Sequence, residues 1–279
     1  MDIVLNNYLT NSSYVALFIV VMVVAKFIYH FSTPYNTFKE LKNKNNTALS
    51  ASIVGYLAGV TIIYVNVMKG PSLGLLEDVA NIAMYTALGM VLLILSRIIN
   101  DKVLLHSYCN HTHLHEKKCL ATGIAQAASY IASGLIIGGA LRGDGNIISA
   151  IAFYALGQVL LIVFTRIYDR FTQFDLQTEL RQGNIAASIS LSATLIAVGI
   201  VLYHAMLGSF VSWQTSLSLF MLDAVIALVL FPILRLLIDK LLLPTVSIDD
   251  AIQRDHNSSL ALFEGAIAIT VATVILFAL

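Results

Sequence analysis

A series of long apolar stretches, separated by turn-forming or charged residues, constrains this chain more than any other feature. A helix needs about 20 mostly apolar residues to cross a bilayer. The sequence lacks the ten-residue segments of alternating polarity that indicate an outer-membrane barrel. We therefore predict an all-α polytopic membrane protein with eight transmembrane helices. They are expected over roughly 13–32, 48–68, 78–99, 120–141, 147–168, 185–206, 214–238 and 258–279.

The composition excludes several classes of function. Charged residues make up 11% of the chain, whereas about 25% is usual in soluble domains. Lys plus Arg and Asp plus Glu both number 16, so no excess charge indicates a nucleic-acid partner. The sequence contains no G-x-S-x-G, H-E-x-x-H, Walker A or G-x-G-x-x-G motif. We expect a protein that is not an enzyme, with the lipid bilayer as its main partner.

The basic residues predict the orientation in the membrane. With eight spans the loops alternate between two sides, and of the 16 Lys and Arg residues only Lys69 and Arg142 fall on the second side. The positive-inside rule places the basic side in the cytoplasm and both termini outside. No basic segment precedes the first span and no A-x-A site follows it. We therefore interpret it as a retained helix and not as a cleaved signal peptide.

The sequence also repeats itself. Residues 1–279 are expected to form one transmembrane domain of four two-helix hairpins, over roughly 13–69, 75–142, 147–207 and 214–279. All four hairpins have the same topology, so they are parallel repeats and not inverted ones.

Similar charged residues recur where the first helices of the hairpins end. They form the pairs Arg97/Asp101, Arg166/Asp169 and Arg235/Asp239. A base and an acid three or four residues apart can pair on one helix face. We interpret these pairs as interfacial anchors. The alternative is a cytoplasmic ring that selects ions.

The second helices of the hairpins begin with a polar residue and continue with small ones. Asn46, Asn184 and Asn257 stand where an N-cap is needed, and Cys119 takes this place in the remaining copy. G-x-x-x-G motifs at 55–59 and 134–138 favour close helix packing. A narrow pore lined by small residues is the alternative. The same small-residue faces could also pack against a second copy or another membrane protein.

This pattern of Glu-Leu, a few polar residues, Asn and a small-residue helix resembles the bacterial family called domain of unknown function 350, the YjfL-like inner-membrane proteins. The best matches are the segments 174–187 and 249–265. The resemblance covers essentially the whole chain and implies a bacterial inner-membrane location, but no established activity. The loop 102–119 departs from the pattern, because a His- and Cys-rich stretch replaces the usual signature there.

Two carboxylates within the predicted spans are candidates for ion or proton binding. An ionisable residue at the centre of a membrane helix costs about 2.5–3.5 kcal/mol or more, so it is a functional candidate by default. Glu264 follows Asn257 by seven residues, and Asp223 lies about nine residues into the seventh span. Each could hold a proton or a cation. The alternative is a structural carboxyl that is hydrogen-bonded to a neighbouring helix.

The loop between the third and fourth spans is a candidate metal site. If this segment is extended, alternate histidines project to one face, and soft thiolates can bind zinc, copper or nickel in a reducing cytoplasm. A solvated linker is the simpler interpretation. The candidate ligands are His106, Cys109, His111, His113, His115 and Cys119.

Two functions therefore remain open. The first is a channel or transporter for protons or small cations that uses Glu264 and Asp223. The second is a non-catalytic scaffold or regulatory subunit, which could sense a metal through the His/Cys loop.

Overall fold

A computed structural model describes residues 2–105, 110–142, 146–208, 210–237, 240–241 and 247–278. The regular elements within these residues are helices. Eight are long: α1 (Asp2–Phe31), α3 (Thr47–Met68), α4 (Leu75–Val103), α6 (Leu120–Arg142), α7 (Ile147–Phe171), α9 (Ile185–Ala205), α10 (Trp213–Leu237) and α12 (Ser258–Ala278). Four are short: α2 (Thr37–Lys44), α5 (Asn110–His115), α8 (Leu176–Gln182) and α11 (Ile248–Gln253).

The long helices lie where the sequence predicts spans. Among the described residues, seven of them are long and apolar enough to cross a membrane: α1 from Thr10 onward, α3, α4, α6, α7, α9 and α12. The remaining predicted span coincides with α10, a 25-residue helix that contains Pro232. The chain is therefore an all-helical, multi-pass membrane protein.

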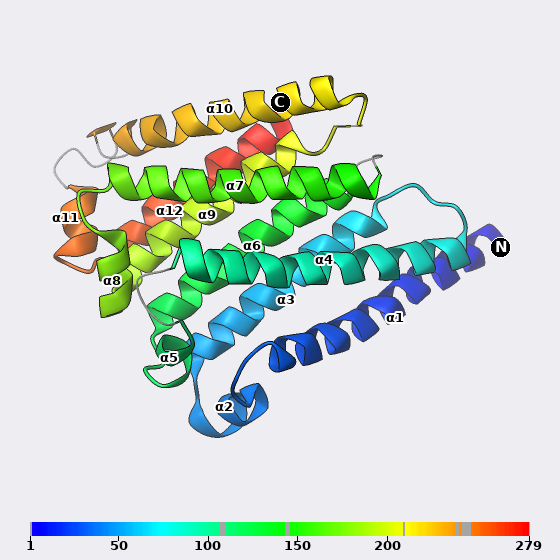
Figure 1. The fold of residues 1–279 in the computed structure, drawn as a ribbon, viewed down its shortest axis with the longest axis horizontal. Coiled ribbons are helices and arrows are strands. Elements are labelled where there is room, and N and C mark those ends of the chain that lie inside the picture. The colour runs from blue at the N-terminus through cyan, green and yellow to red at the C-terminus, as the bar shows by residue number, and fades with distance from the viewer. Residues whose placement is uncertain are drawn as a thin grey trace.

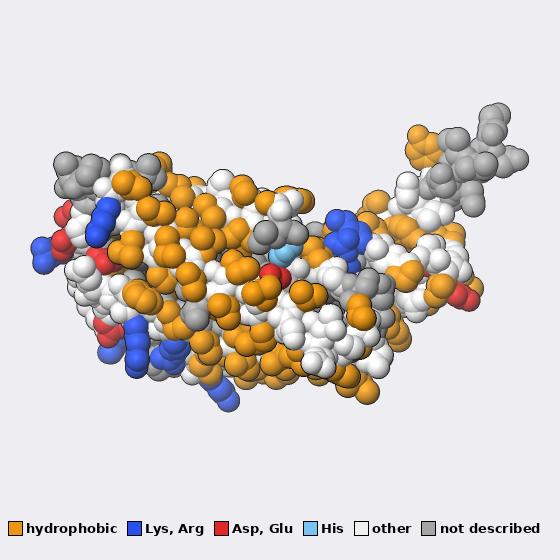
Figure 2. Space-filling view, turned by 90° about the horizontal axis from the view of Figure 1, so that it is seen from above, with side chains coloured by type: hydrophobic (Ala, Val, Ile, Leu, Met, Phe, Trp, Pro, Cys, Tyr) orange, Lys and Arg blue, Asp and Glu red, His pale blue; other side chains and the backbone are white. Residues whose placement is uncertain are grey.

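The long helices form two layers (Figure 1). The helices α3, α6, α9 and α12 pack consecutively and make up what we call the inner row. The helices α1, α4, α7 and α10 lie across this row as an outer layer. The short helices α2, α5, α8 and α11 gather at one end, on the left of Figure 1, which we call the short-helix end. Charged side chains concentrate there, and hydrophobic ones cover much of the face shown in Figure 2.

Each hairpin turns into its inner-row helix in the same way. The residue before each inner helix cap has a left-handed backbone: Asn45 (φ 46°), Lys118 (φ 49°), Gly183 (φ 87°) and His256 (φ 50°). The next residue in three of the four copies is an asparagine that caps the helix. The side-chain oxygens of Asn46, Asn184 and Asn257 accept from Leu49, Ala187 and Leu260 amides at 3.0, 3.2 and 3.1 Å.

Two of these asparagines also tie their hairpin to the next one. The Nδ2 of Asn46 donates to the carbonyl of Leu114 at 2.7 Å. The Nδ2 of Asn184 donates to the carbonyl of Ile252 at 2.8 Å. In both cases the acceptor belongs to the short helix of the following hairpin, 68 residues further along the chain. One residue type thus caps a helix and fixes the spacing between repeats.

Small residues allow the inner row to pack closely. Gly55 lies against the backbone of Ala127, and a Cβ added at Gly134 would lie 2.7 Å from the Cα of Gly59. The packing role predicted for the two G-x-x-x-G motifs is therefore confirmed. In the C-terminal half, Gly265 packs against the Cβ of Ala193. The contact has the same register as that of Gly55 with Ala127, but glycine and alanine have exchanged places.

Candidate functional site

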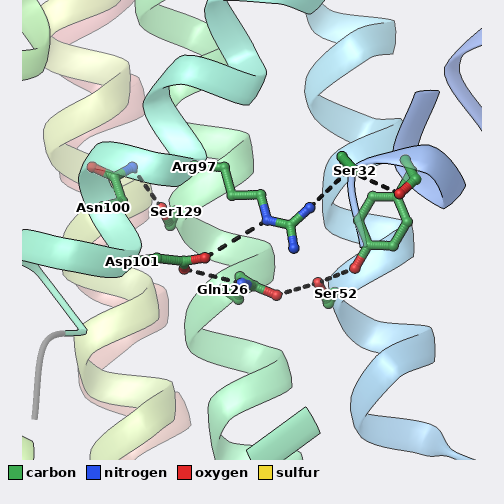
Figure 3. A network of polar contacts seen from close by, with 8 residues as sticks. Ser32, Ser52, Arg97, Asn100, Asp101, Gln126 and Ser129 are labelled. Atoms are coloured by element: carbon green, nitrogen blue, oxygen red, sulfur yellow. Dashed lines mark hydrogen bonds and ion pairs between the residues drawn. The ribbon is translucent and has the colours of Figure 1, made fainter. Parts of the chain in front are cut away.

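Buried polar side chains cross the interior of the N-terminal half near the short-helix end (Figure 3). Tyr29 of α1 and Ser52 of α3 share a hydrogen bond of 2.9 Å. The Ser52 hydroxyl donates to Oε1 of Gln126 on α6 at 2.5 Å, so the Tyr29 hydroxyl is the donor to Ser52. The Nε2 of Gln126 donates to Oδ1 of Asp101 on α4 at 3.0 Å. One directional chain of hydrogen bonds therefore joins four helices.

Arg97 completes this chain. Its Nε lies 3.6 Å from Oδ2 of Asp101, and its Nη1 donates to Oγ of Ser32 at 2.8 Å. Its guanidinium carbon lies 5.4 Å from the centre of the Tyr29 ring. The pair has the i,i+4 geometry that its spacing predicts, but it is not at an exposed interface, because Arg97 is only 6% exposed. The Asp101 carboxylate, the Ser32 hydroxyl and the Tyr29 ring surround its guanidinium group in place of water.

The side chains of the second charged pair, Arg166 and Asp169, contact neighbouring segments. Arg166 donates from Nη2 to the carbonyl of Val103 at 2.7 Å, at the end of α4. Oδ1 of Asp169 accepts from the amide of Leu176, at the start of α8. These two side chains therefore join their helix to neighbouring segments. The side chain of Arg235 and the whole of Asp239 lie outside the described part of the chain.

A second set of hydrogen bonds is centred on Asn100, the residue before Asp101. The Nδ2 of Asn100 on α4 donates to the hydroxyls of Ser129 at 2.7 Å and Ser133 at 3.2 Å. Its Oδ1 accepts from Nε2 of Gln158 on α7 at 2.6 Å. The amides of Asn100 and Gln158 thus join three helices. Interhelical hydrogen bonds of this kind hold membrane helices together.

The C-terminal half contains a related chain of hydrogen bonds. Ser190 of α9 donates to Oε2 of Glu264 on α12 at 2.8 Å. The hydroxyls of Tyr168 on α7 and Ser190 lie 2.6 Å apart. Since the Ser190 proton points to the carboxylate, Tyr168 is the donor to Ser190. Glu264 is 6% exposed and belongs to the buried part of α12.

These two chains occupy equivalent positions. Ser190 follows Ser52 by 138 residues, and Glu264 follows Gln126 by the same number. Tyr168 follows Tyr29 by 139 residues, which is one residue more than the spacing of the other two pairs. The site that holds a neutral amide in one half therefore holds a carboxyl group in the other.

The second candidate carboxylate has different surroundings. Asp223 lies in the outer layer on α10 and is half-buried. His204, near the end of α9, is close enough to interact with it electrostatically. Glu264 instead contacts Ser190. The two carboxylates thus lie on helices of different layers.

Part of the candidate metal loop is helical, so its histidines do not alternate as they would in an extended segment. Asn110–His115 forms α5, and residues two apart on a helix point to different faces. The histidine side chains also have other contacts. His113 Nε2 lies 3.2 Å from Nζ of Lys117, and His115 Nε2 lies 3.1 Å from Oε1 of Glu40. The ring of His115 stacks on Tyr35 at 4.8 Å.

No group of three or more metal-ligating side chains lies together in the described part of the chain. Cys119 is a free thiol that is partly exposed. Burial lowers the pKa of His113 below its usual value, and the positive charges of Lys117 and Arg181 add to this effect. The candidates His106 and Cys109 and the side chain of His111 lie outside the described residues.

A cavity of about 340 Å³ opens away from the polar network, near the loop between α3 and α4. Asp78 lines it, and its carboxylate accepts from the hydroxyls of Tyr14 at 3.0 Å and Ser72 at 2.5 Å and from the amide of Leu73 at 2.7 Å. On the other side Arg142 donates to the Tyr203 hydroxyl at 3.1 Å. Asp78 thus fastens the α3–α4 loop to α1.

The sequence alone did not reveal the hydroxyl partners. Tyr29, Ser52, Tyr168 and Ser190 are common residues in common surroundings, and their partners lie 22 to 74 residues away. One signal was nevertheless present. When the two halves are aligned with an offset of 138 residues, Ser52 pairs with Ser190 and Gln126 pairs with Glu264.

Parallel hairpins, an inner row of small-residue helices and long apolar helices define this chain as a polytopic helical membrane protein. It matches the family described as Domain of Unknown Function (DUF350) twice, over residues 3–141 and 141–279. The chain belongs to this family, and each copy of the family unit contains two of the four hairpins. The two matches begin 138 residues apart, which is the spacing that relates Gln126 to Glu264.

One curated relative is a UPF0719 transmembrane protein from Aquifex aeolicus (strain VF5). It is 26% identical to this chain over 226 residues, which cover 79% of this chain and 82% of the relative. No solved structure matches the chain.

Proposed function

We propose that the protein is a conduit for protons or small cations in the bacterial inner membrane, and that Glu264 binds the ion in transit. The observation that carries this proposal is a buried carboxyl group that accepts from a serine hydroxyl, where the other half of the protein has an amide. Placing an ionisable group at this depth is costly. Gln126 demonstrates that the same fold can fill the equivalent place without that cost.

The neighbours of Glu264 favour a proton over a metal cation. Tyr168 and Ser190 are hydroxyl groups, which can both donate and accept a hydrogen bond. A proton can therefore pass along them by rotation of the hydroxyls. Tyr168 is half-buried and lies three residues before the end of α7. Glu264 lies six residues into α12, or about 9 Å along it. The chain therefore leads from the short-helix end into the membrane.

The N-terminal half then acts as a fixed counterpart. The Gln126 amide accepts from Ser52 and donates to Asp101 at the same time. It has no site that gains or loses a proton in the physiological range. The charge of Asp101 is balanced within the protein by Arg97. This half supports the bundle, while the C-terminal half carries the titratable group.

The expected orientation follows from the basic residues. The short-helix end carries the basic loops and is proposed to face the cytoplasm, with both termini on the outer side. Tyr168 would then connect Glu264 to the cytoplasm. Asp223, on α10 near His204, is the candidate for the outer part of the path.

The test is ion flux into proteoliposomes that contain the purified protein. A proton gradient is imposed first, followed by gradients of monovalent and divalent cations, with empty liposomes as the baseline. We expect proton flux with the wild-type protein and its loss in Glu264→Gln. This variant installs the residue that the fold already accepts at the equivalent place. Asp223→Asn tests the outer part of the path, and Ser218→Ala is an exposed control on α10.

Two results would overturn the proposal. The first is no wild-type flux above empty liposomes for any ion. The second is full flux in Glu264→Gln with unchanged monodispersity. Either result favours a scaffold or regulatory subunit. That alternative is supported by the four short helices at one end, where the side chains of Arg170 and Arg181 are exposed. Charge reversal at these two arginines should then lose a partner in pull-downs from native membranes.

A further inference from the structure

A groove lies on the side of the molecule formed by the first hairpin, apart from the Glu264 site. The helices α1, α2 and α3 enclose about 610 Å³ there, which is within the range of about 300–1,000 Å³ typical of small-ligand sites. Its walls are apolar side chains of all three helices, such as Met22, Phe38 and Leu57. A ligand that fills this groove must be largely hydrocarbon.

Lys26 places a positive charge at the same groove. Its Nζ lies 4.4 Å from the centre of the Phe38 ring and 6.0 Å from that of Phe27. The Lys26 side chain is exposed, and no carboxylate of the described residues forms an ion pair with it. Lys39 and Lys42 on α2 are exposed as well. The aromatic rings hold the ammonium group at the groove, and an anion would complete its surroundings.

The other half of the protein shows what fills the equivalent place. Phe18 of the groove corresponds to Gly157 on α7, 139 residues later. A Cβ at Gly157 would lie 2.6 Å from Cγ2 of Ile136, so α6 packs closely there. Lys26 corresponds in the same way to Thr165, which is buried. The small Gly157 allows α6 to lie close to α7. The bulky Phe18 stands at the corresponding place on α1 and prevents a helix from packing as closely there. A flexible chain can still enter.

We propose that this groove binds one anionic phospholipid, with an acyl chain among the apolar side chains and the phosphate at Lys26. Lys26 lies five residues before the end of α1, or about 8 Å along it. A lysine at that depth extends its ammonium group toward the headgroups. The lipid therefore comes from the leaflet at the short-helix end, and its headgroup meets a basic surface.

The experiment compares lipid retention by native mass spectrometry. The delipidated full-length protein is reconstituted with equal amounts of phosphatidylglycerol and phosphatidylcholine and then transferred to detergent. We expect the wild-type protein to retain one phosphatidylglycerol preferentially. Lys26→Gln should lower this retention about fivefold, as expected for one lysine near an anionic headgroup. Phosphatidylcholine retention should not change in this variant.

Two further variants make the outcome decisive. Met22→Trp fills the groove and should lower the retention of both lipids. Lys102→Gln removes an exposed lysine in the last turn of α4, at the same end of the molecule, and should change neither. Equal phosphatidylglycerol retention by the wild type and Lys26→Gln would overturn the proposal. So would an equal loss in Lys102→Gln, or a lipid-free dimer in which a second copy covers the groove.

Discussion

Gln126 and Glu264 occupy the same place in the two halves of the protein, and each accepts a hydrogen bond from the serine on the preceding inner-row helix. The two side chains differ by one group, an amide nitrogen in place of an oxygen. In Gln126 that nitrogen donates to Asp101. The amide is therefore required where the partly buried carboxylate of Asp101 lies next to it, and this requirement distinguishes the two halves.

The first prediction concerns Gln126→Glu. This change removes the donor to Asp101 and places two carboxyl groups next to each other, so one of them must take up a proton or lose its hydrogen bond. We expect a loss of about 2 kcal/mol in the free energy of unfolding, since buried acceptors are costly to leave unsatisfied. SDS titration of the protein in detergent micelles measures it. Glu264→Gln is the reciprocal control and should stay within about 1 kcal/mol. Equal stability of Gln126→Glu and the wild type would contradict the directional chain.

The second prediction concerns the ion pair of Arg97 and Asp101, whose side chains are 6% and 19% exposed. Arg97→Gln leaves the Asp101 carboxylate without its cation, and removal of one partner of a buried pair typically costs about 3–5 kcal/mol. Arg254→Gln is the matched control. Arg254 and Asp250 form an i,i+4 pair at 3.2 Å, but their side chains are 76% and 51% exposed. Exposed pairs contribute about 0–1 kcal/mol. A similar loss of stability in both variants, measured by the same titration, would show that Arg97 is accessible to water.

The third prediction concerns the helix crossing at Gly55. Gly55→Ala pushes a methyl group into Ala127 of α6, and overpacking typically costs about 1–3 kcal/mol. The double variant Gly55→Ala/Ala127→Gly should recover part of that loss, because the C-terminal half packs Ala193 against Gly265 in the same register. A double-mutant cycle on unfolding measures the recovery. Purely additive losses would show that the two halves cross differently.

The fourth prediction concerns pH. Burial and the nearby Lys117 and Arg181 lower the pKa of His113 in the folded protein, so the folded state favours the neutral imidazole. The resulting stabilisation is complete above the unfolded pKa of about 6.5 and is lost as the pH falls from there toward the folded value. The free energy of unfolding should therefore decrease between pH 7.5 and 5.5, and by less in His113→Gln.

The control for this experiment is the exposed His256, which has a left-handed backbone. His256→Asn suits it, since asparagine tolerates that conformation, and should keep the wild-type slope. If His113→Gln also keeps the full slope, His113 does not titrate as its burial requires.

Local patterns revealed the fold to a large extent. The lengths and order of the spans follow from apolar stretches, and the caps at Asn46 and Asn184 follow from residue type and position. The packing role of Gly55 and Gly134 follows from their spacing. Each of these features depends on neighbours within a turn or two of the helix, so a single sequence is enough to predict it.

The polar site was harder to predict because its contacts are not local. Glu264 was a candidate from its depth alone, whereas Ser190 is 74 residues away and has no unusual spacing. Arg97 was interpreted as an interfacial anchor. Its burial could not be predicted, because it depends on Tyr29 and Ser32 of another hairpin. The contacts of His115 with Glu40 and Tyr35 likewise cross between hairpins.

The covalent joining of two family units has a consequence for how the protein can change. When identical subunits assemble, every substitution appears in all of them, so a carboxyl group introduced at one site is introduced at its counterpart too. Beside Asp101, that second carboxyl group would meet a like charge. Because both units lie in one chain, one can keep Gln126 while the other acquires Glu264. Fusion thus removes the symmetry that would otherwise force structure and chemistry to share the same residue.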